Sequence, residues 1–194
     1  MEPLLIDVPG RIAIDRLVLR PPQPGDGAML NAAVRESLAE LKPWLPWAQV
    51  EPSVQESERD CRRMHARFAA REDLVYFIFE RSAGDAEGAL VGGTGLHRID
   101  WSVPRFEIGY WRRTGFERRG LVGEAVRALA RMAFDTLAAR RVEIRMDAHN
   151  ARSARVAERA GFTFEGVLRQ DCLDVAGAGR DTRVYSRVRG VEES

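Results

Sequence analysis

The chain has 194 residues, and its 30 lysines and arginines nearly balance its 29 aspartates and glutamates, for a formal net charge of +1. Such a balance provides no general attraction to nucleic acid or to a membrane surface. The two cysteines, Cys61 and Cys172, lie in unrelated segments without metal-ligand spacing, so the sequence predicts neither a disulfide framework nor a metal site.

The length fits one domain, residues 1–194. The clusters of proline and glycine at 21–27 and 177–179 are only as long as turns, and no internal repeat is present. No apolar run approaches the ~18 residues of a membrane-spanning helix, and the N-terminus lacks the basic and apolar regions of a signal peptide. We therefore expect a cytoplasmic protein.

The first third of the chain predicts a strand and two helices. Imperfectly alternating apolar residues indicate a strand over 12–20. Asp26 can cap a helix that ends before Pro43 and whose apolar face recurs about every four residues, with Leu30, Val34, Leu38 and Leu41. Ser53 and Glu56 form a capping box, so a second helix should run to about residue 70.

The remainder alternates strands with helices. Strands over 74–80, 89–100 and 106–111 are joined by short connections, which predicts an antiparallel meander. A helix over 121–137 should then lead into a strand over 142–147 that returns beside its predecessor. A short helix over 151–160 and strands over 162–175 and 181–188 complete the chain. The expected fold class is α/β, with a mixed, mostly antiparallel sheet.

One segment, 116–125, lies between a predicted strand and the N-terminus of the most regular helix. Free backbone N–H groups and the helix dipole form an anion site there, and glycine lets a phosphate approach the backbone. Arg118 and Arg119 add positive charge. The segment therefore fits a pyrophosphate, although Gly120 and Gly123 would also suit a plain tight turn. It matches neither a Walker loop nor the G-x-G-x-x-G fingerprint.

Four segments follow a known pattern in the right order. They are PWLPW at 43–47, EIGYW at 107–111, the loop 118–125, and residues 150–166, which match N-x-x-S-x-x-V-x-E-x-x-G-F-x-x-E-G. Together they resemble the GCN5-related N-acetyltransferase (GNAT) superfamily and, within it, the RimJ/RimL group of ribosomal-protein N-terminal acetyltransferases. The resemblance spans nearly the whole chain.

The resemblance implies an enzyme that moves an acetyl group from acetyl-coenzyme A (acetyl-CoA) to a primary amine by direct attack on the thioester. In this family the cofactor enters where the fourth and fifth strands splay apart. A backbone N–H of the fourth strand, here within Ile108, Gly109 and Tyr110, polarises the thioester oxygen. The residues implied to bind the pyrophosphate are Arg118, Arg119, Gly120, Leu121, Val122, Gly123 and Glu124.

The loop departs from the family pattern Q/R-x-x-G-x-G/A. Glu117 occupies the first position and Val122 the last, with glycine displaced to Gly123. Backbone donors survive a valine, so we expect binding to persist. An acidic Glu117 near phosphates would be unfavourable unless its side chain points away.

The acceptor amine must lose a proton before it attacks, which requires a carboxylate or a water held by one. Glu107 is the first candidate and Asp171 the second, with a surface ion pair as the alternative for both. The resemblance maps the proton donor to the leaving thiolate onto Ser153, with Asn150 orienting the cofactor or that serine. Both residues could instead cap the short helix.

Aromatic residues and histidines complete the candidate list. Trp44 and Trp47, held by prolines, are expected to line the acceptor cleft, with core packing as the alternative. His65 and His97 are expected to be surface or hydrogen-bonded strand histidines rather than catalysts.

The identity of the acceptor follows from magnitudes together with the resemblance. An α-amino group with a pKa of ~7.7–8.0 is roughly 10% neutral at pH 7, whereas lysine is below ~0.1%. A protein or peptide N-terminus therefore needs less help from a general base to lose its proton. A small amine such as a polyamine or antibiotic, succinyl-CoA as donor, and a non-catalytic acyl-CoA sensor are the alternatives. Group members are often dimers, and the strand at 162–175 could pair across a two-fold axis.

Overall fold

The structure is a computed structural model that describes residues 2–193, with every side chain in that range except that of Asp85. The helices are α1 (Gly27–Leu41), α2 (Val54–Ala69), α3 (Leu121–Asp135) and α4 (Ala151–Arg159). The strands are β1 (Ile12–Ala13), β2 (Leu17–Arg20), β3 (Leu74–Arg81), β4 (Glu87–Asp100), β5 (Arg105–Arg112), β6 (Arg141–Asp147), β7 (Thr163–Leu173) and β8 (Gly179–Val188). Short 3-10 turns lie at Pro3–Leu5, Pro46–Ala48 and Ala83–Asp85.

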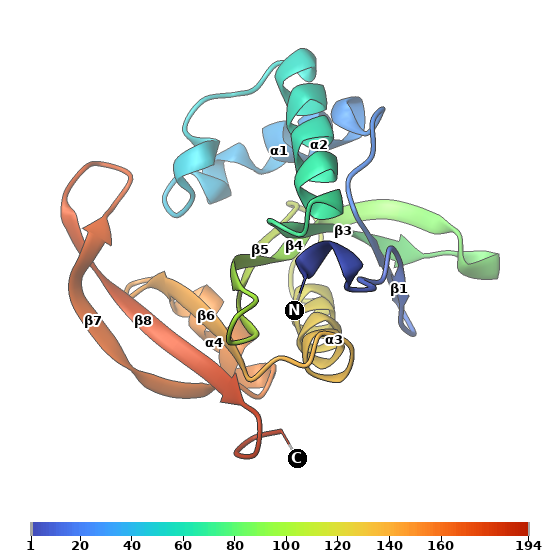
Figure 1. The fold of residues 1–194 in the computed structure, drawn as a ribbon. Coiled ribbons are helices and arrows are strands. Elements are labelled where there is room, and N and C mark those ends of the chain that lie inside the picture. Colours follow the sequence, from blue (N-terminus) through green and yellow to red (C-terminus); the bar gives the residue numbers. More distant parts are fainter. Residues whose placement is uncertain (1, 194) are drawn as a thin grey trace.

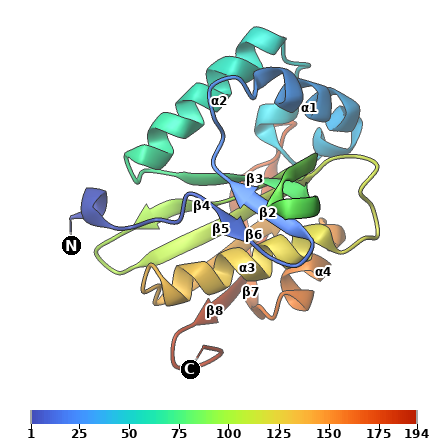
Figure 2. The same cartoon turned by 90° about the vertical axis from the view of Figure 1, so that its right-hand side faces the viewer.

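These strands form one sheet in the order β1-β2-β3-β4-β5-β6-β8-β7. Within it β5 and β6 are parallel and the other neighbouring pairs are antiparallel. Helices α1 and α2 cover one face of the sheet, and α3 and α4 lie against the other (Figures 1 and 2). The expected mixed α/β fold is confirmed.

The centre of the sheet is buried on both faces. Along β3, Tyr76 and Ile78 belong to the core beneath α3, while Phe77 and Phe79 belong to the core beneath α1 and α2. All four side chains are at most 1% exposed. Because successive strand residues point to opposite faces, an uninterrupted apolar run is what a sheet covered on both sides requires.

Two sequence predictions about the N-terminal region were wrong. The predicted strand over 12–20 is a tight hairpin, in which the Ile14 N–H donates to the Leu17 carbonyl at 2.9 Å and β1 pairs with β2. Asp26 does not cap α1, because its carboxylate binds the Arg20 guanidinium at 2.6 Å and the Gln23 N–H at 2.8 Å. A partly buried ion pair takes the place of the cap.

A carboxylate from α2 occupies the N-terminus of α1 instead. Glu58 accepts the N–H groups of Gly25 and Gly27, each at 3.0 Å. The two helices approach so closely that a Cβ on Gly27 would lie 2.5 Å from the Cα of Glu58. This contact fixes the angle at which α1 leaves the sheet.

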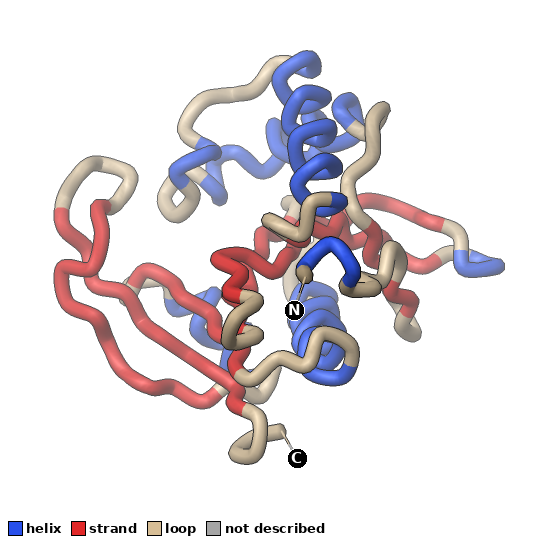
Figure 3. Tube along the Cα trace, viewed as in Figure 1, coloured by secondary structure: helices blue, strands red, loops and turns tan. Residues whose placement is uncertain are grey.

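The parallel pair β5 and β6 separates along its length. It is joined only at Arg105↔Arg141, Phe106↔Val142 and Glu107↔Glu143, after which β5 continues to Arg112 and β6 to Asp147 without pairing. The tube representation in Figure 3 follows the red strands apart from this point. The expected splayed pair is therefore present, and α3 is the connection between its two strands.

The capping box at the start of α2 is formed as predicted from the sequence. Ser53 Oγ accepts the Glu56 N–H at 3.2 Å, and the Glu56 carboxylate accepts the Ser53 N–H at 2.8 Å. We expect Ser53→Ala to lower the free energy of unfolding by about 1 kcal/mol, because an N-terminal amide loses its partner. Gln55→Ala, an exposed change in the same turn, is the control. Equal urea midpoints for the two variants would contradict the assignment.

Candidate active site

A cavity of about 240 Å³ opens where β5 and β6 separate. We call it the splay cleft. Its lining comes from the two strands, the segment after α1 and the start of α4: Trp44, Leu45, Pro46, Glu107, Ile108, Gly109, Tyr110, Ile144, Arg145, Met146, Asp147, Asn150, Ser153 and Arg180. The structure thus brings together seven of the residues predicted from separate segments of the sequence: Trp44, Glu107, Ile108, Gly109, Tyr110, Asn150 and Ser153.

Backbone groups of β5 face this cleft. The Arg113 N–H donates to the Val91 carbonyl at 2.8 Å. Hydrogen-bonded positions alternate along an antiparallel ladder, so Gly109 and Trp111 also direct their backbone groups toward β4, and Ile108 and Tyr110 direct theirs away from it. Tyr110 lies beyond the last β5–β6 pair. Its backbone N–H therefore faces the splay cleft without a strand partner.

Tyr110 and Ser153 form a hydroxyl pair at one wall of the cleft. The Tyr110 hydroxyl lies 2.9 Å from the Ser153 carbonyl, to which it donates, and 2.8 Å from Ser153 Oγ. Burial raises the pKa of Tyr110, which keeps its hydroxyl protonated. Asn150 Oδ1 accepts the Ser153 N–H at 3.1 Å. The local capping role considered for Asn150 is therefore present, and Ser153 Oγ faces Tyr110.

The loop before α3 leaves several donors open. Gly120 has a φ of 76°, a left-handed conformation that favours glycine, and its carbonyl accepts the Glu124 N–H at 3.2 Å. The N–H groups of the first helical residues before Glu124 consequently have no partner inside the helix. Val122 points into the core and is 8% exposed, so the valine at this departure from the family pattern does not fill the outer side of the loop.

Charged side chains surround this helix start. Arg118 is exposed, and no acidic residue among 2–193 forms an ion pair with it. Arg119 binds Glu80 and lies 5.4 Å above the Phe116 ring, while Glu124 is held by Arg16. Arg118 is thus the cation of this loop that is free to meet an anion.

Glu117 is engaged on the strand side of the loop. Its carboxylate accepts the Gly115 N–H at 2.9 Å and a hydrogen bond from Arg112 at 3.0 Å. Hydrogen bonds from its own backbone and from Gly115, together with the Arg112 charge, lower the pKa of Glu117. The carboxylate is therefore neutralised locally.

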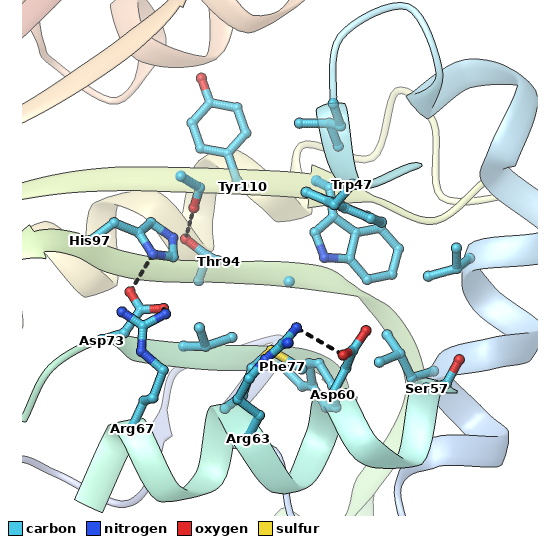
Figure 4. Close-up of a pocket in the computed structure, with 18 of the residues that line it drawn as sticks. Trp47, Ser57, Asp60, Arg63, Arg67, Asp73, Phe77, Thr94, His97 and Tyr110 are labelled. Atoms are coloured by element: carbon cyan, nitrogen blue, oxygen red, sulfur yellow. Dashed lines mark hydrogen bonds and ion pairs between the residues drawn. The ribbon is translucent and has the colours of Figure 1, made fainter. Parts of the chain in front are cut away.

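A second cavity, of about 390 Å³, lies between α2 and the sheet. We call it the helix-side cavity (Figure 4). Trp47 stands at its edge, 53% exposed, with its ring 6.1 Å from that of Trp111 in an edge-on arrangement. The two cavities share Leu45, Gly109 and Tyr110 in their linings. Trp44 thus lines one cavity and Trp47 the other, and strand β5 runs between them.

The two candidate carboxylates differ in position. Glu107 lines the splay cleft with its side chain 19% exposed, and its Oε2 lies 3.4 Å from Arg98 Nε without a hydrogen bond. Burial raises the pKa of Glu107. Asp171 lines neither cavity. It binds Arg145 at 2.7 Å, and this hydrogen bond lowers the pKa of Asp171. The structure places Glu107, but not Asp171, at the site.

The sequence reasoning missed a histidine–aspartate pair. His97 Nδ1 lies 2.6 Å from Asp73 Oδ1, and both residues line the helix-side cavity. The two residues are 24 positions apart in the sequence, which matches no motif that would have indicated the pair. His97 also lies directly opposite Glu107 in the β4–β5 register, a relation that the sequence alone does not reveal.

Residues 2–193 contain neither a cluster of metal ligands nor a membrane-spanning helix. No group of three or more His, Cys, Asp or Glu side chains in this range could hold a metal ion. Within the same range, no helix is both long and apolar enough to cross a membrane. Burial raises the pKa of Cys61 to about 12, which makes this thiol a poor nucleophile.

Comparison with known families and proteins identifies relatives along most of the chain. Residues 16–163 match the model of the acetyltransferase (GNAT) domain. YdaF of Bacillus subtilis strain 168, which carries the name of a ribosomal N-acetyltransferase, is 32% identical over 181 residues, covering 90% of this chain and 92% of that protein. The ribosomal-protein-serine acetyltransferase of Escherichia coli K12 is 29% identical over 154 residues, covering 76% and 80%.

Solved structures share the fold. The microcin C7 self-immunity acetyltransferase MccE, solved with acetyl-CoA and AMP, superposes with a TM-score of 0.84 at 23% identity, covering 94% of this chain and 98% of that one. RimL, the ribosomal L7/L12 α-N-protein acetyltransferase solved with coenzyme A, gives a TM-score of 0.83 at 24% identity, covering 92% and 97%. At these identities the likeness concerns the architecture.

The pKa of Glu107 is raised and that of Asp171 is lowered, so we expect their amide variants to change the stability of the fold in opposite directions at neutral pH. Because the folded chain raises the pKa of Glu107 above its ordinary 4.5, folding favours the protonated carboxyl, and the free energy of unfolding falls as pH rises through the folded-state pKa. We expect Glu107→Gln to remove this loss, so its melting temperature should exceed that of the wild type at about pH 7.5 and lose the advantage at about pH 4.5.

Asp171→Asn is the control, because its melting temperature should change in the opposite direction. The lowered pKa of Asp171 means that its carboxylate stabilises the fold above pH 3.8, a contribution lost only as pH falls through the folded-state pKa. This variant should melt below the wild type at about pH 7.5. Thermal unfolding followed by circular dichroism measures both, and a pH-independent shift for Glu107→Gln would contradict the burial argument.

Proposed function

Because the chain belongs to the GNAT acetyltransferase family, we propose that it transfers an acetyl group from acetyl-CoA to the N-terminal α-amine of a protein or peptide. The observation that supports this most directly is that the splay cleft and the helix-side cavity meet at Gly109 and Tyr110. One space can hold the thioester while the other delivers the amine. Gly109 has no side chain to separate them.

The residues proposed to hold acetyl-CoA supply mainly backbone donors. The pyrophosphate would meet the N–H groups of residues 121–123 and the Arg118 guanidinium, at the positive end of the α3 dipole. The thioester would lie in the splay cleft, with its carbonyl oxygen toward the Tyr110 N–H. A fixed donor at a developing oxyanion is typically worth ~10²–10³ in rate. Ile108, Gly109 and Asn150 would complete the lining.

Ser153 is proposed to serve the leaving thiolate. Its hydroxyl lies in the splay cleft, and the neutral Tyr110 hydroxyl 2.8 Å away can support it. A thiolate with a pKa near ~8.5 needs only a weak proton donor. Held in place by Tyr110, the Ser153 hydroxyl can pass a proton from the attacking nitrogen to the sulfur when the carbon–sulfur bond breaks.

The choice of an α-amine rests on proton chemistry and on the relatives. An α-amino group is far more often neutral at pH 7 than a lysine, and the relatives named above act by name on ribosomal proteins. The helix-side cavity, at about 390 Å³, has the size of a small-ligand site. Trp47 and Trp111 at its edge can pack against the residues that follow an N-terminus.

The partners we propose are acyl-CoA and a protein N-terminus, with no nucleic acid and no membrane surface. The proposed location is the cytoplasm, which cell fractionation tests.

We also propose a homodimer. Strand β7 is an edge of the sheet with large apolar side chains outside: Phe164, Val167, Leu168 and Leu173 are 42–67% exposed. A second copy could cover them. A light-scattering mass near 21.8 kDa, that of one chain, would contradict the dimer.

The function is tested by following free-thiol release from acetyl-CoA with a panel of acceptors. We expect release with peptides that carry a free N-terminus, and none with the same peptides after N-terminal acetylation. Release only with polyamines or aminoglycosides would move the acceptor to small amines. Binding of acetyl-CoA without release, repeated with succinyl-CoA, would leave a non-catalytic sensor as the explanation.

The proposed contact between Arg118 and the pyrophosphate can be tested through the affinity for coenzyme A. We expect Arg118→Gln to raise the Kd for coenzyme A roughly tenfold, about 1.4 kcal/mol, because one charge-assisted contact to phosphate is lost. The variant should also show a weaker dependence of Kd on salt. Arg155→Gln, at an exposed position on α4, is the matched control, and calorimetry measures all three proteins. An equal change in both variants would contradict the pyrophosphate site.

A further inference from the structure

His97 lies directly over the meeting point of the two cavities. Its ring sits against β4 and β5 at the paired glycines Gly95 and Gly109, where a Cβ on either residue would lie 3.0 Å from His97 Nε2. Any larger residue would displace the imidazole. The imidazole ring therefore packs directly against the backbone of the two glycines, next to Tyr110.

Asp73 orients this imidazole. Its Oδ1 lies 2.6 Å from His97 Nδ1, and Arg67 NH1 lies 3.3 Å from its Oδ2 (Figure 4). A carboxylate can only accept, so Nδ1 carries the proton and the lone pair of the neutral ring is on Nε2. No residue among 2–193 forms a hydrogen bond with that Nε2. A histidine held by a carboxylate and open at its other nitrogen is the usual arrangement of a general base.

The carboxylates are less well placed for this role. Glu107 contributes to the splay cleft rather than to the helix-side cavity, and Arg98 lies 3.4 Å from it. Asp171 lines neither cavity, and its carboxylate is paired with Arg145 of the splay cleft. Of these three groups, His97 is the one that lines the cavity through which the amine would arrive.

We infer that His97 Nε2, positioned by Asp73, is the general base that deprotonates the acceptor amine, an inference that rests on the proposed function. The ammonium gives one proton to Nε2, and the neutral nitrogen bonds to the thioester carbon. The carbon–sulfur bond then breaks, the coenzyme A sulfur takes the second nitrogen proton through Ser153, and an amide remains. The imidazolium finally releases its proton to solvent.

The charged and titratable groups around the ring come from every neighbouring element. They are Asp60, Arg63 and Arg67 of α2, Asp73 before β3, Arg98 of β4, and Glu107 and Tyr110 of β5. Asp60 binds Arg63 at 2.8 Å, and Arg67 contacts Asp73. Most of these charges are therefore paired with one another, and Asp73 is the carboxylate in contact with the imidazole.

The test compares His97→Gln with the wild type in the peptide assay. We expect kcat to fall ~10²–10⁴-fold with the KM for acetyl-CoA unchanged. The deficit should shrink as pH rises toward the pKa of the peptide amine, because more acceptor is then neutral without help. Added imidazole should restore part of the rate to His97→Ala. Asp73→Asn, a positioning change, should lower kcat less and alter the same pH profile.

His65→Gln is the matched control, because His65 is an exposed histidine of α2 that contacts the Pro22 carbonyl at 3.0 Å. Calorimetric binding of acetyl-CoA and the melting temperature establish that each variant is folded. A His97→Gln enzyme with wild-type rates and pH profile would overturn the inference about His97 but leave the proposed function standing. The same loss at every pH, without rescue by imidazole, would also overturn it. A wild type inactive with every amine would overturn the proposed function, and this inference with it.

Discussion

The site depends on one interruption of backbone hydrogen bonding, the separation of β5 from β6 after Glu107↔Glu143. A buried backbone N–H without a partner is costly, so the Tyr110 N–H is a place where a ligand gains by binding. The connection between the two strands is α3, whose N-terminus begins at Leu121 soon after β5 ends. The Tyr110 N–H and the N–H groups at the start of α3, which we propose meet the thioester oxygen and the pyrophosphate, are thereby brought to the same end of the sheet.

Strand β5 also lies between the two cavities. Phe106 and Ile108 pack in the core beneath α3, and Tyr110 extends from the same face to Ser153 on α4. Trp111 packs on the opposite side, beneath α1 and α2. Between them, Gly109 presents only backbone and belongs to the lining of both cavities. The alternation of side chains along β5 thus separates the two cavities, which we propose hold the acyl donor and the acceptor, and the absence of a side chain at Gly109 lets them meet.

Most elements were predictable because their signals are local: apolar periodicity for α3, a capping box for α2, and short turns between β3, β4 and β5. The start of α3 after Gly120 was predictable from the glycines and arginines that precede an apolar periodic run, while anion binding there stays a prediction. Asp26 was misread because its ion pair with Arg20 competes with the cap, and no spacing reveals such a competition. The pairing of Asp73 with His97 depends on the register of β3, β4 and β5, which only tertiary structure sets.

The contact between Glu58 and the start of α1 has a consequence for how acceptor preference can change. Glu58 ties α2 to Gly25 and Gly27, and the absent Cβ of Gly27 lets the two helices touch. The two helices are therefore in direct contact at the start of α1, while the segment between them carries Trp44 and Trp47. Under the proposed function, substitutions in that segment would reshape the entrance for a different amine and leave the Glu58 contact between the helices in place.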